Sequence, residues 1–215
     1  MGLALTSAAL PASPRLQITV DPPAKALRGL DLAAYTQLAE ETCDAPAWRL
    51  QRHAQDLPEQ LTQALRAFGY YAPEVTAEFF PATADKACWS AEVRIQPGEP
   101  VRISRRQITV LGEAQALPAL PEAIAASPVQ PGAILHHGDY EALKRTLMRL
   151  LTQQGYLDAR WQQAVLRVNP DALSAEVILT LDSGSPYRIG ALSYQGELPL
   201  SAQRLQRISG IRTGD

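Results

Sequence analysis

The sequence is poor in the residues that most often carry chemistry. Only two cysteines and three histidines occur among 215 residues, and no ligand spacing completes a metal site around His53, His136 or His137. No serine lies in a nucleophile-elbow motif, and the glycine-containing turns lack the spacing of a phosphate-cradling loop. We therefore expect no catalysis, no cofactor and no metal.

An excess of charge of one sign and long apolar runs are also missing. The formal net charge is -2 with the basic residues spread along the chain, which argues against a nucleic-acid partner. No run of about 18 apolar residues occurs, so we expect no bilayer-spanning helix. The hydrophobic content of 46% is nevertheless enough for a folded core.

The first residues are small and apolar. Residues 1–14 are typical of the end of a signal peptide and its cleavage region, although the basic segment that begins such peptides is missing. A disordered leader is the alternative. In either case we expect this segment to lie outside the folded part.

An internal repeat predicts the architecture. Gly69 and Gly155 each end a helical pattern and precede a tyrosine, and they lie 86 positions apart. Gly98 and Gly184 begin a second pair of similar motifs with the same offset of 86. A shared offset at two places indicates two copies of one structural unit.

The first copy predicts the order β-α-α-β-β. We expect a strand over residues 16–20 and a first helix over residues 31–41. The second helix should begin at Asp56, with Pro58 in its first turn, and should end at Gly69. Alternating runs over residues 74–80 and 87–95 form a hairpin, and one side of the latter is apolar. That apolar side consists of Trp89, Ala91, Val93 and Ile95.

The second copy repeats this order, and a third copy begins after it. The elements expected in the second copy are a strand over 101–111, helices over 117–126 and 139–154, and strands over 160–168 and 175–181. A strand over 187–194 and a helix over 200–208 would open the third. The fold class is therefore α+β, with two helices on a three-stranded mixed sheet in each module. The expected modules cover residues 15–99, 100–185 and, incompletely, 186–215.

Several motifs carry a resemblance to a known family. They are Ala64–Tyr71, Pro97–Val101, Gly138–Glu141, Gly155–Asp158, and Asp182–Gly184 followed by Tyr187. At these residues the chain resembles the POTRA domains of the Omp85 superfamily, and more closely its translocation-and-assembly branch. The resemblance implies the periplasmic part of a Gram-negative outer-membrane protein, whose membrane β-barrel would follow residue 215.

The resemblance also implies a role as a scaffold. Its partners would be outer-membrane or autotransporter client polypeptides and an inner-membrane-anchored protein. The alternative is a periplasmic enzyme or small-ligand-binding protein that uses a cleft between modules. We expect Trp48, Trp89 and Trp161 to pack in the core or at strand margins, and assign none of them to a ligand.

The two cysteines, Cys43 and Cys88, are expected to form a disulfide. In a β-α-α-β-β unit the first helix ends at the same pole as the second hairpin, and both cysteines lie there. Strict alternation from Trp89 would turn Cys88 away from the helices, and this counts against the pairing unless the strand starts irregularly.

A strand edge is the expected client-binding surface. The leading strand of each hairpin, residues 74–80 or 160–168, should keep backbone groups open on one side and could accept an extended client by β-augmentation. The candidate residues are Glu74, Thr76, Glu78, Arg160, Gln162 and Gln163. The alternative is that their charges merely protect the edges from unwanted pairing.

Overall fold

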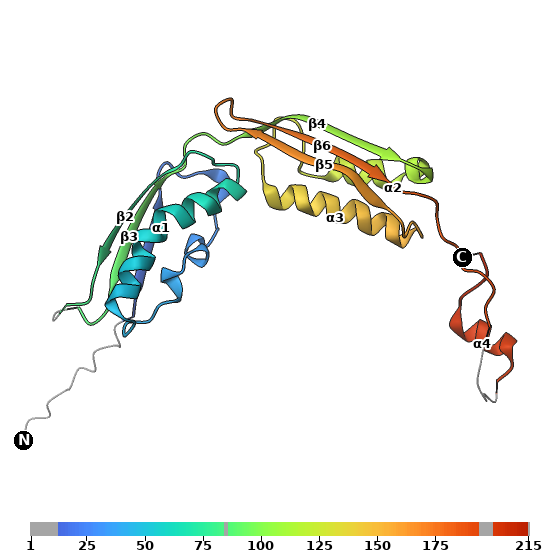
Figure 1. The fold of residues 1–215 in the computed structure, drawn as a ribbon, viewed down its shortest axis with the longest axis horizontal. Coiled ribbons are helices and arrows are strands. Elements are labelled where there is room, and N and C mark those ends of the chain that lie inside the picture. Colours follow the sequence, from blue (N-terminus) through green and yellow to red (C-terminus); the bar gives the residue numbers. More distant parts are fainter. Residues whose placement is uncertain (1–12, 84–85, 194–199, 215) are drawn as a thin grey trace, which may run out of the picture. The chain divides into compact units, whose positions relative to one another are not determined.

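The computed structural model describes residues 13–83, 86–193 and 200–214 (Figure 1). Contacts divide the chain into two compact units. The first contains the residues up to Ser104 together with Pro131–Gly138 and Val168–Ala175. The second contains Arg105–Gln130, Asp139–Arg167 and the residues from Glu176 onward. Most of the expected leader lies outside the described residues.

The first sheet contains three strands, β1 (Arg15–Val20), β2 (Glu74–Phe80) and β3 (Ser90–Gln96). Their order is β1-β3-β2, with β1 parallel and β2 antiparallel to β3. This mixed sheet confirms the expected fold class, and β2 has the bounds that the alternating pattern predicted. Figure 1 shows α1 (Ala47–Ala67) lying along one face of these strands.

The central strand β3 is apolar on one side, as predicted. Ala91, Val93 and Ile95 are at most 1% exposed, whereas the residues between them are exposed. These side chains face the helical layer and form its floor. The opposite side of the sheet is polar, and a hollow there is lined largely by polar residues, among them Gln17, Thr19, Asp21, Glu92, Arg94 and Gln96.

Helix α1 corrects one expectation. It begins directly after Pro46, and Pro58 lies inside it and not in its first turn. The expected start at Asp56 was wrong because Asp56 and Pro58 imitate the beginning of a helix. Pro58 donates no amide hydrogen to the carbonyl of Ala54.

Burial of an apolar face explains why α1 continues through its proline. This face runs from the first half of the helix into the second without a break, and its buried residues are Leu50, Ala54, Leu57, Leu61, Ala64 and Leu65. Leu57, Leu61 and Leu65 are completely buried. Each such leucine contributes about 1.5–3 kcal/mol of burial free energy, so together they offset the hydrogen bond lost at Pro58.

The expected first helix over residues 31–41 was also wrong. Three short 3-10 turns cover this region, Lys25–Leu27, Leu32–Tyr35 and Leu38–Glu40. The buried anchors Leu27, Leu32 and Leu38 are five and six residues apart, so they cannot share one face of an α-helix. Each turn therefore buries one leucine, and the chain extends between them.

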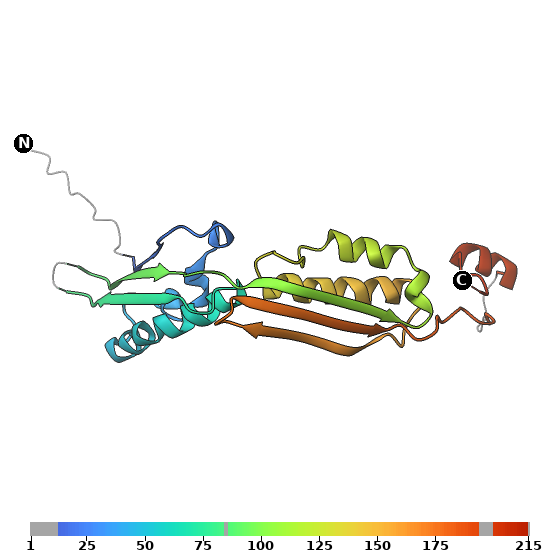
Figure 2. The same cartoon turned by 90° about the horizontal axis from the view of Figure 1, so that it is seen from above.

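The second sheet contains β4 (Arg102–Leu111), β5 (Arg160–Asn169) and β6 (Ser174–Asp182) in the order β4-β6-β5. Figure 2 shows the three strands side by side. Two helices belong to this part, α2 (Ala119–Ala126) and α3 (His137–Gln153). The buried residues include Leu120, Leu143, Leu147, Leu151, Val177, Leu179 and Leu181. These elements agree with the expected order to within a few residues.

The repeated glycines have the same conformation. Gly69 follows α1 with φ +91°, and Gly155 follows α3 with φ +86°. In both places the amide of the next tyrosine donates to a carbonyl five residues earlier, which ends the helix as a Schellman-type cap. The two bonds are Tyr70 N to Leu65 O, 3.1 Å, and Tyr156 N to Leu151 O, 3.0 Å. The predicted helix ends are confirmed.

The C-terminal segment departs in part from expectation. A helix, α4 (Ala202–Ser209), lies close to the predicted position and is capped by Ser201, whose side chain accepts from the amide of Arg204. The expected strand over 187–194 is absent from residues 187–193, and Tyr194 lies outside the described residues. None of the helices in the described ranges has the length and apolar character needed to cross a membrane.

Candidate binding edge of the first sheet

The pairing of β1 with β3 fixes which way the backbone groups of β3 point. The amide of Arg15 donates to the carbonyl of Trp89 at 3.4 Å, and that of Asp21 donates to Ile95 at 2.9 Å. Backbone N–H and C=O groups alternate in direction along a strand, so those of the odd-numbered residues of β3 point to β1. The N–H and C=O groups of its even-numbered residues therefore point to β2.

The register then identifies the open backbone groups of β2. Thr76 pairs with Arg94, so it belongs to the set of residues that exchange hydrogen bonds with β3. The alternate residues, Val75, Ala77 and Phe79, turn their N–H and C=O groups to the other side, where no strand lies within the described part of the chain. We call these outward groups the open edge.

The side chains of the open edge lie on the helical side of the sheet. Val75, Ala77 and Phe79 are partly buried against the first core. The predicted residues Glu74, Thr76 and Glu78 are exposed on the opposite face, with their backbone groups directed to β3. The sequence analysis thus identified the edge strand but missed the residues with open groups, because that assignment depends on the register.

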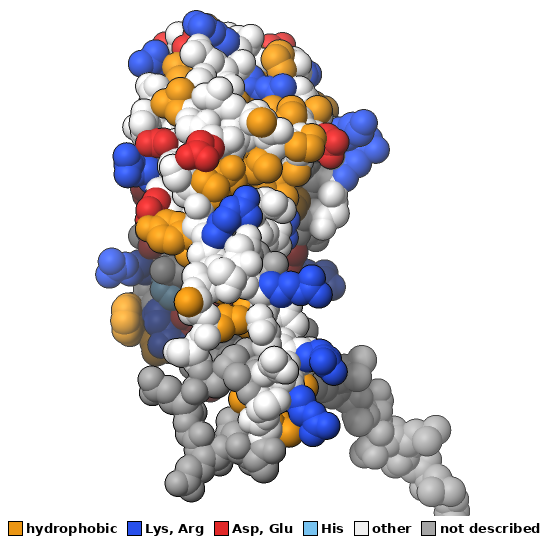
Figure 3. All heavy atoms as spheres, turned by 90° about the vertical axis from the view of Figure 1, so that its right-hand side faces the viewer, with side chains coloured by type: hydrophobic (Ala, Val, Ile, Leu, Met, Phe, Trp, Pro, Cys, Tyr) orange, Lys and Arg blue, Asp and Glu red, His pale blue; other side chains and the backbone are white. Residues whose placement is uncertain are grey.

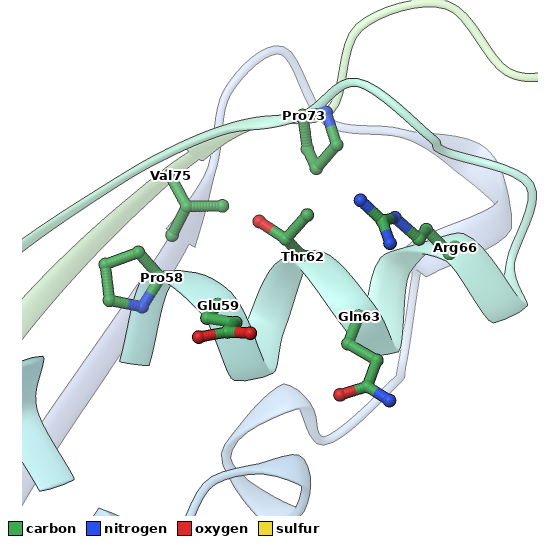
Figure 4. A pocket seen from close by; sticks show the side chains of 7 residues that line it. All are labelled: Pro58, Glu59, Thr62, Gln63, Arg66, Pro73 and Val75. Carbon is green, nitrogen blue, oxygen red and sulfur yellow. The ribbon is translucent and has the colours of Figure 1, made fainter. Parts of the chain in front are cut away.

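A polar hollow lies beside the first half of β2 (Figure 4). It has a volume of 510 Å³, and we call it the Arg66 hollow; its lining residues are Pro58, Glu59, Thr62, Gln63, Arg66, Pro73 and Val75. Figure 4 shows the Arg66 guanidinium near Pro73, at the end where β2 begins, while the Glu59 carboxylate lies farther from the strand. The hollow therefore holds one cation and one carboxylate, with the guanidinium on the side where β2 begins.

A more apolar hollow lies beside the second half of β2. It has a volume of 430 Å³, and we call it the Phe79 hollow; its lining residues are Cys43, Ala45, Ala47, Leu50, Gln51, Phe79, Pro81 and Ala82. Trp48 follows Ala47 on α1 and is 68% exposed, so the expectation that it packs in the core or at a margin was wrong. An exposed aromatic ring and an apolar hollow thus lie near the end of β2.

The disulfide between Cys43 and Cys88 forms part of this region. The Cα atoms are 4.9 Å apart, well inside the limit set by disulfide geometry. Alternation along the strand does not turn Cys88 away, because β3 begins only at Ser90. Cys43, which the disulfide ties to the segment before β3, lines the Phe79 hollow.

The edge strand of the second sheet, β5, is engaged differently. Arg160 and Gln162 donate to the same oxygen of Asp182, at 3.2 and 3.1 Å. The amide of Gly184 donates to the other carboxylate oxygen, and this bond, followed by that of Gln162, lowers the pKa of Asp182. Two of the three predicted residues on β5 are therefore tied to a neighbouring strand, whereas Gln163 is exposed.

The described residues offer little for other kinds of site. They contain no group of three or more His, Cys, Asp or Glu side chains that could hold a metal. On the face drawn in Figure 3, lysine and arginine side chains are interspersed with hydrophobic and acidic ones. The clearest candidate site is therefore the open edge with its two hollows.

Comparison with known families defines the class of this region. Residues 31–97 match the family model described as POTRA domain TamA domain 1. This stretch of the chain is therefore similar to a POTRA domain. More particularly, it is similar to the first POTRA domain of TamA.

Solved POTRA and Omp85 structures show low similarity to this chain. The POTRA3-5 structure of BamA from Haemophilus influenzae is 12% identical, with a TM-score of 0.45 over 99% of this chain and 82% of that chain. POTRA1-2 of the periplasmic domain of Omp85 from Anabaena is 15% identical, with a TM-score of 0.34 over 82% and 99%. The N-terminal domain of Omp85 from Thermosynechococcus elongatus is 16% identical, with a TM-score of 0.37 over 96% and 80%.

Proposed function

We propose that this chain is a non-catalytic, periplasmic docking region of an outer-membrane assembly factor, and that it receives extended client polypeptides along strand β2. The observation that carries the proposal is the open edge of Val75, Ala77 and Phe79. Main-chain hydrogen bonds do not depend on the client's side chains, so one edge can serve many sequences. The match to a TamA-type POTRA domain supports this role.

The wider setting is part of the same proposal. Residues 100–185 form a second POTRA module, and residues 186–215 begin a third. The clients are outer-membrane or autotransporter polypeptides, and a TamB-like protein anchored in the inner membrane is a further partner. The disulfide agrees with an oxidising compartment such as the periplasm.

Site-specific crosslinking tests the docking surface. A photo-reactive side chain at Thr76 or Gln163, beside the edges of β2 and β5, should capture an unfolded outer-membrane client. The same group at Lys144 or Arg149 on α3 serves as the control. Capture at the helix positions without capture at the edges contradicts the proposal, because the client would then bind beside helices.

The TamB-like partner needs a separate test. The periplasmic part of such a protein should co-elute with this chain in size-exclusion chromatography without an added client. If the two elute separately at concentrations well above those of the cell envelope, the partner is removed from the proposal while the client edge is unaffected.

A further inference from the structure

We propose that the edge of β2 selects client strands with an apolar side chain followed four residues later by a carboxylate. This inference rests on the proposed function, since it describes the client that the same edge accepts. It follows from the direction of the open backbone groups and from the different chemistry of the two hollows.

The face on which client side chains lie follows from the pairing. A client residue that exchanges hydrogen bonds with Val75 or Phe79 has its side chain on the same face of the sheet as theirs. That face is the helical side, where both hollows are located. The client residues one and three places after the apolar one turn to the polar face, whereas the residue between them lies opposite Ala77 on the helical side.

The spacing is set by β2 itself. Val75 lines the Arg66 hollow and Phe79 lines the Phe79 hollow, and they are four residues apart on one strand. An added strand has nearly the same rise per residue, so the client residues at the two hollows are also four apart. A separation of three would turn one of them to the wrong face.

The two hollows differ in chemistry. The Phe79 hollow has apolar walls that suit an aromatic or aliphatic client side chain; they include Leu50, Phe79 and Pro81. In the Arg66 hollow, Arg66 is exposed and forms no ion pair with another described residue. A guanidinium beside Thr62 is suited to a carboxylate, from an acidic side chain or a chain terminus.

The order of the two residues depends on strand direction. Antiparallel pairing is the more stable kind per residue, and it runs the client from the Phe79 end of β2 to the Val75 end. The apolar residue therefore comes first and the carboxylate follows. The client is an extended strand of this pattern, with any side chains that tolerate a β conformation between.

The test uses the 215-residue chain and a blocked peptide, acetyl-Thr-Phe-Thr-Val-Thr-Asp-Thr-amide. Its affinity is measured by titration of the backbone amide NMR signals of Val75, Ala77 and Phe79. One control peptide exchanges the Phe and Asp, and another moves the Asp one place nearer to the Phe. We expect both to bind at least fivefold more weakly than the first.

A charge exchange separates recognition from structural damage. Arg66→Glu should abolish the preference for the Asp peptide and create one for the same peptide with Lys in its place. Arg52→Glu, on an exposed part of the same helix, should change neither. For the apolar hollow, Gln51→Glu should weaken the Phe peptide, whereas Gln55→Glu one turn farther should not.

The results distinguish this inference from the proposal beneath it. If all the peptides bind with equal affinity and still crosslink at Thr76, the proposed residue pattern is wrong, but the docking edge is supported. If no peptide shifts the β2 amides and none crosslinks at Thr76, the pattern and the docking edge are both wrong.

Discussion

Trp89 donates its indole N–H to the backbone oxygen of Thr42 across 3.1 Å. Each of these residues is next to a cysteine of the Cys43–Cys88 disulfide, so a polar and a covalent link join the same two segments. Trp89 is only 2% exposed, and its donor would be costly to bury without a partner. The segment before α1 is thereby fixed to the start of β3.

Removal of the disulfide should destabilise the first unit. The bond closes a loop between residues 45 positions apart, so replacing both cysteines by serine should lower the free energy of unfolding by about 3–4 kcal/mol. Trp89→Phe removes the donor and part of a buried ring system, so it should cost about 1 kcal/mol for the hydrogen bond and a further amount for the lost packing. Urea unfolding measures both, and equal midpoints for the oxidised and reduced wild-type chain would show that the bond contributes nothing.

Proline substitutions should separate the two kinds of residue on β2. The amide of Ala77 belongs to the open edge, whereas that of Thr76 is bonded to β3. Ala77→Pro should therefore cost at least about 1 kcal/mol less of unfolding free energy than Thr76→Pro, because proline is tolerated where the N–H faces outward. Ala77→Pro should nevertheless abolish client crosslinking at a retained fold. Equal destabilisation by the two prolines contradicts the derived register.

Gly155 should be intolerant of a side chain. It has φ +86°, and an added Cβ would lie 2.7 Å from the carbonyl oxygen of Tyr187. Gly132 has almost the same φ, +85°, but open space around it, so it is a matched control. We expect Gly132→Ala to cost about 1–2 kcal/mol from the backbone conformation alone. Gly155→Ala should cost at least about 1 kcal/mol more from the close contact, as measured by thermal or urea unfolding.

Asp182 should titrate below the ordinary aspartate value of about 3.9. The amide of Gly184 and the side chain of Gln162 favour its anionic form, so the pKa in the folded chain is lower than in the unfolded chain. The resulting stabilisation is present above about pH 4 and is lost as the pH falls through the folded pKa. Carboxyl NMR titration measures the pKa directly, and Gln162→Leu should raise it. An unshifted value in the wild-type chain would falsify this assignment.

The strands were more predictable from the sequence than the helices of the first unit. The alternation of apolar and polar residues predicted the bounds of β2 and the buried side of β3. This is possible because a strand with one buried face has a simple sequence period of two residues. Leu27, Leu32 and Leu38 carry no such period, since each is buried by a separate turn. Local signals at Pro58 favoured a helix start, and only burial along the whole of α1 overrides them.

The candidate site was predictable only as far as its strand. Alternation and hairpin order indicated that β2 lies at an edge, and the sheet order confirms it. Which of its residues have open backbone groups depends on pairing between β1 and β3, which are far apart in the sequence. The apolar hollow depends on Cys43, Leu50 and Phe79 lying around one space, and no local pattern could indicate that arrangement.

The alternation along β2 also separates the positions that tolerate substitution from those that do not. Thr76 and its exposed neighbours could be exchanged for many polar residues, because their side chains contact neither the core nor the hollows. Val75, Ala77 and Phe79 have a double constraint, since their side chains pack against the core and their backbone lines the edge. Such a strand tolerates many substitutions on its outer face, whereas every second position is restricted to residues that pack against the core and keep the backbone N–H.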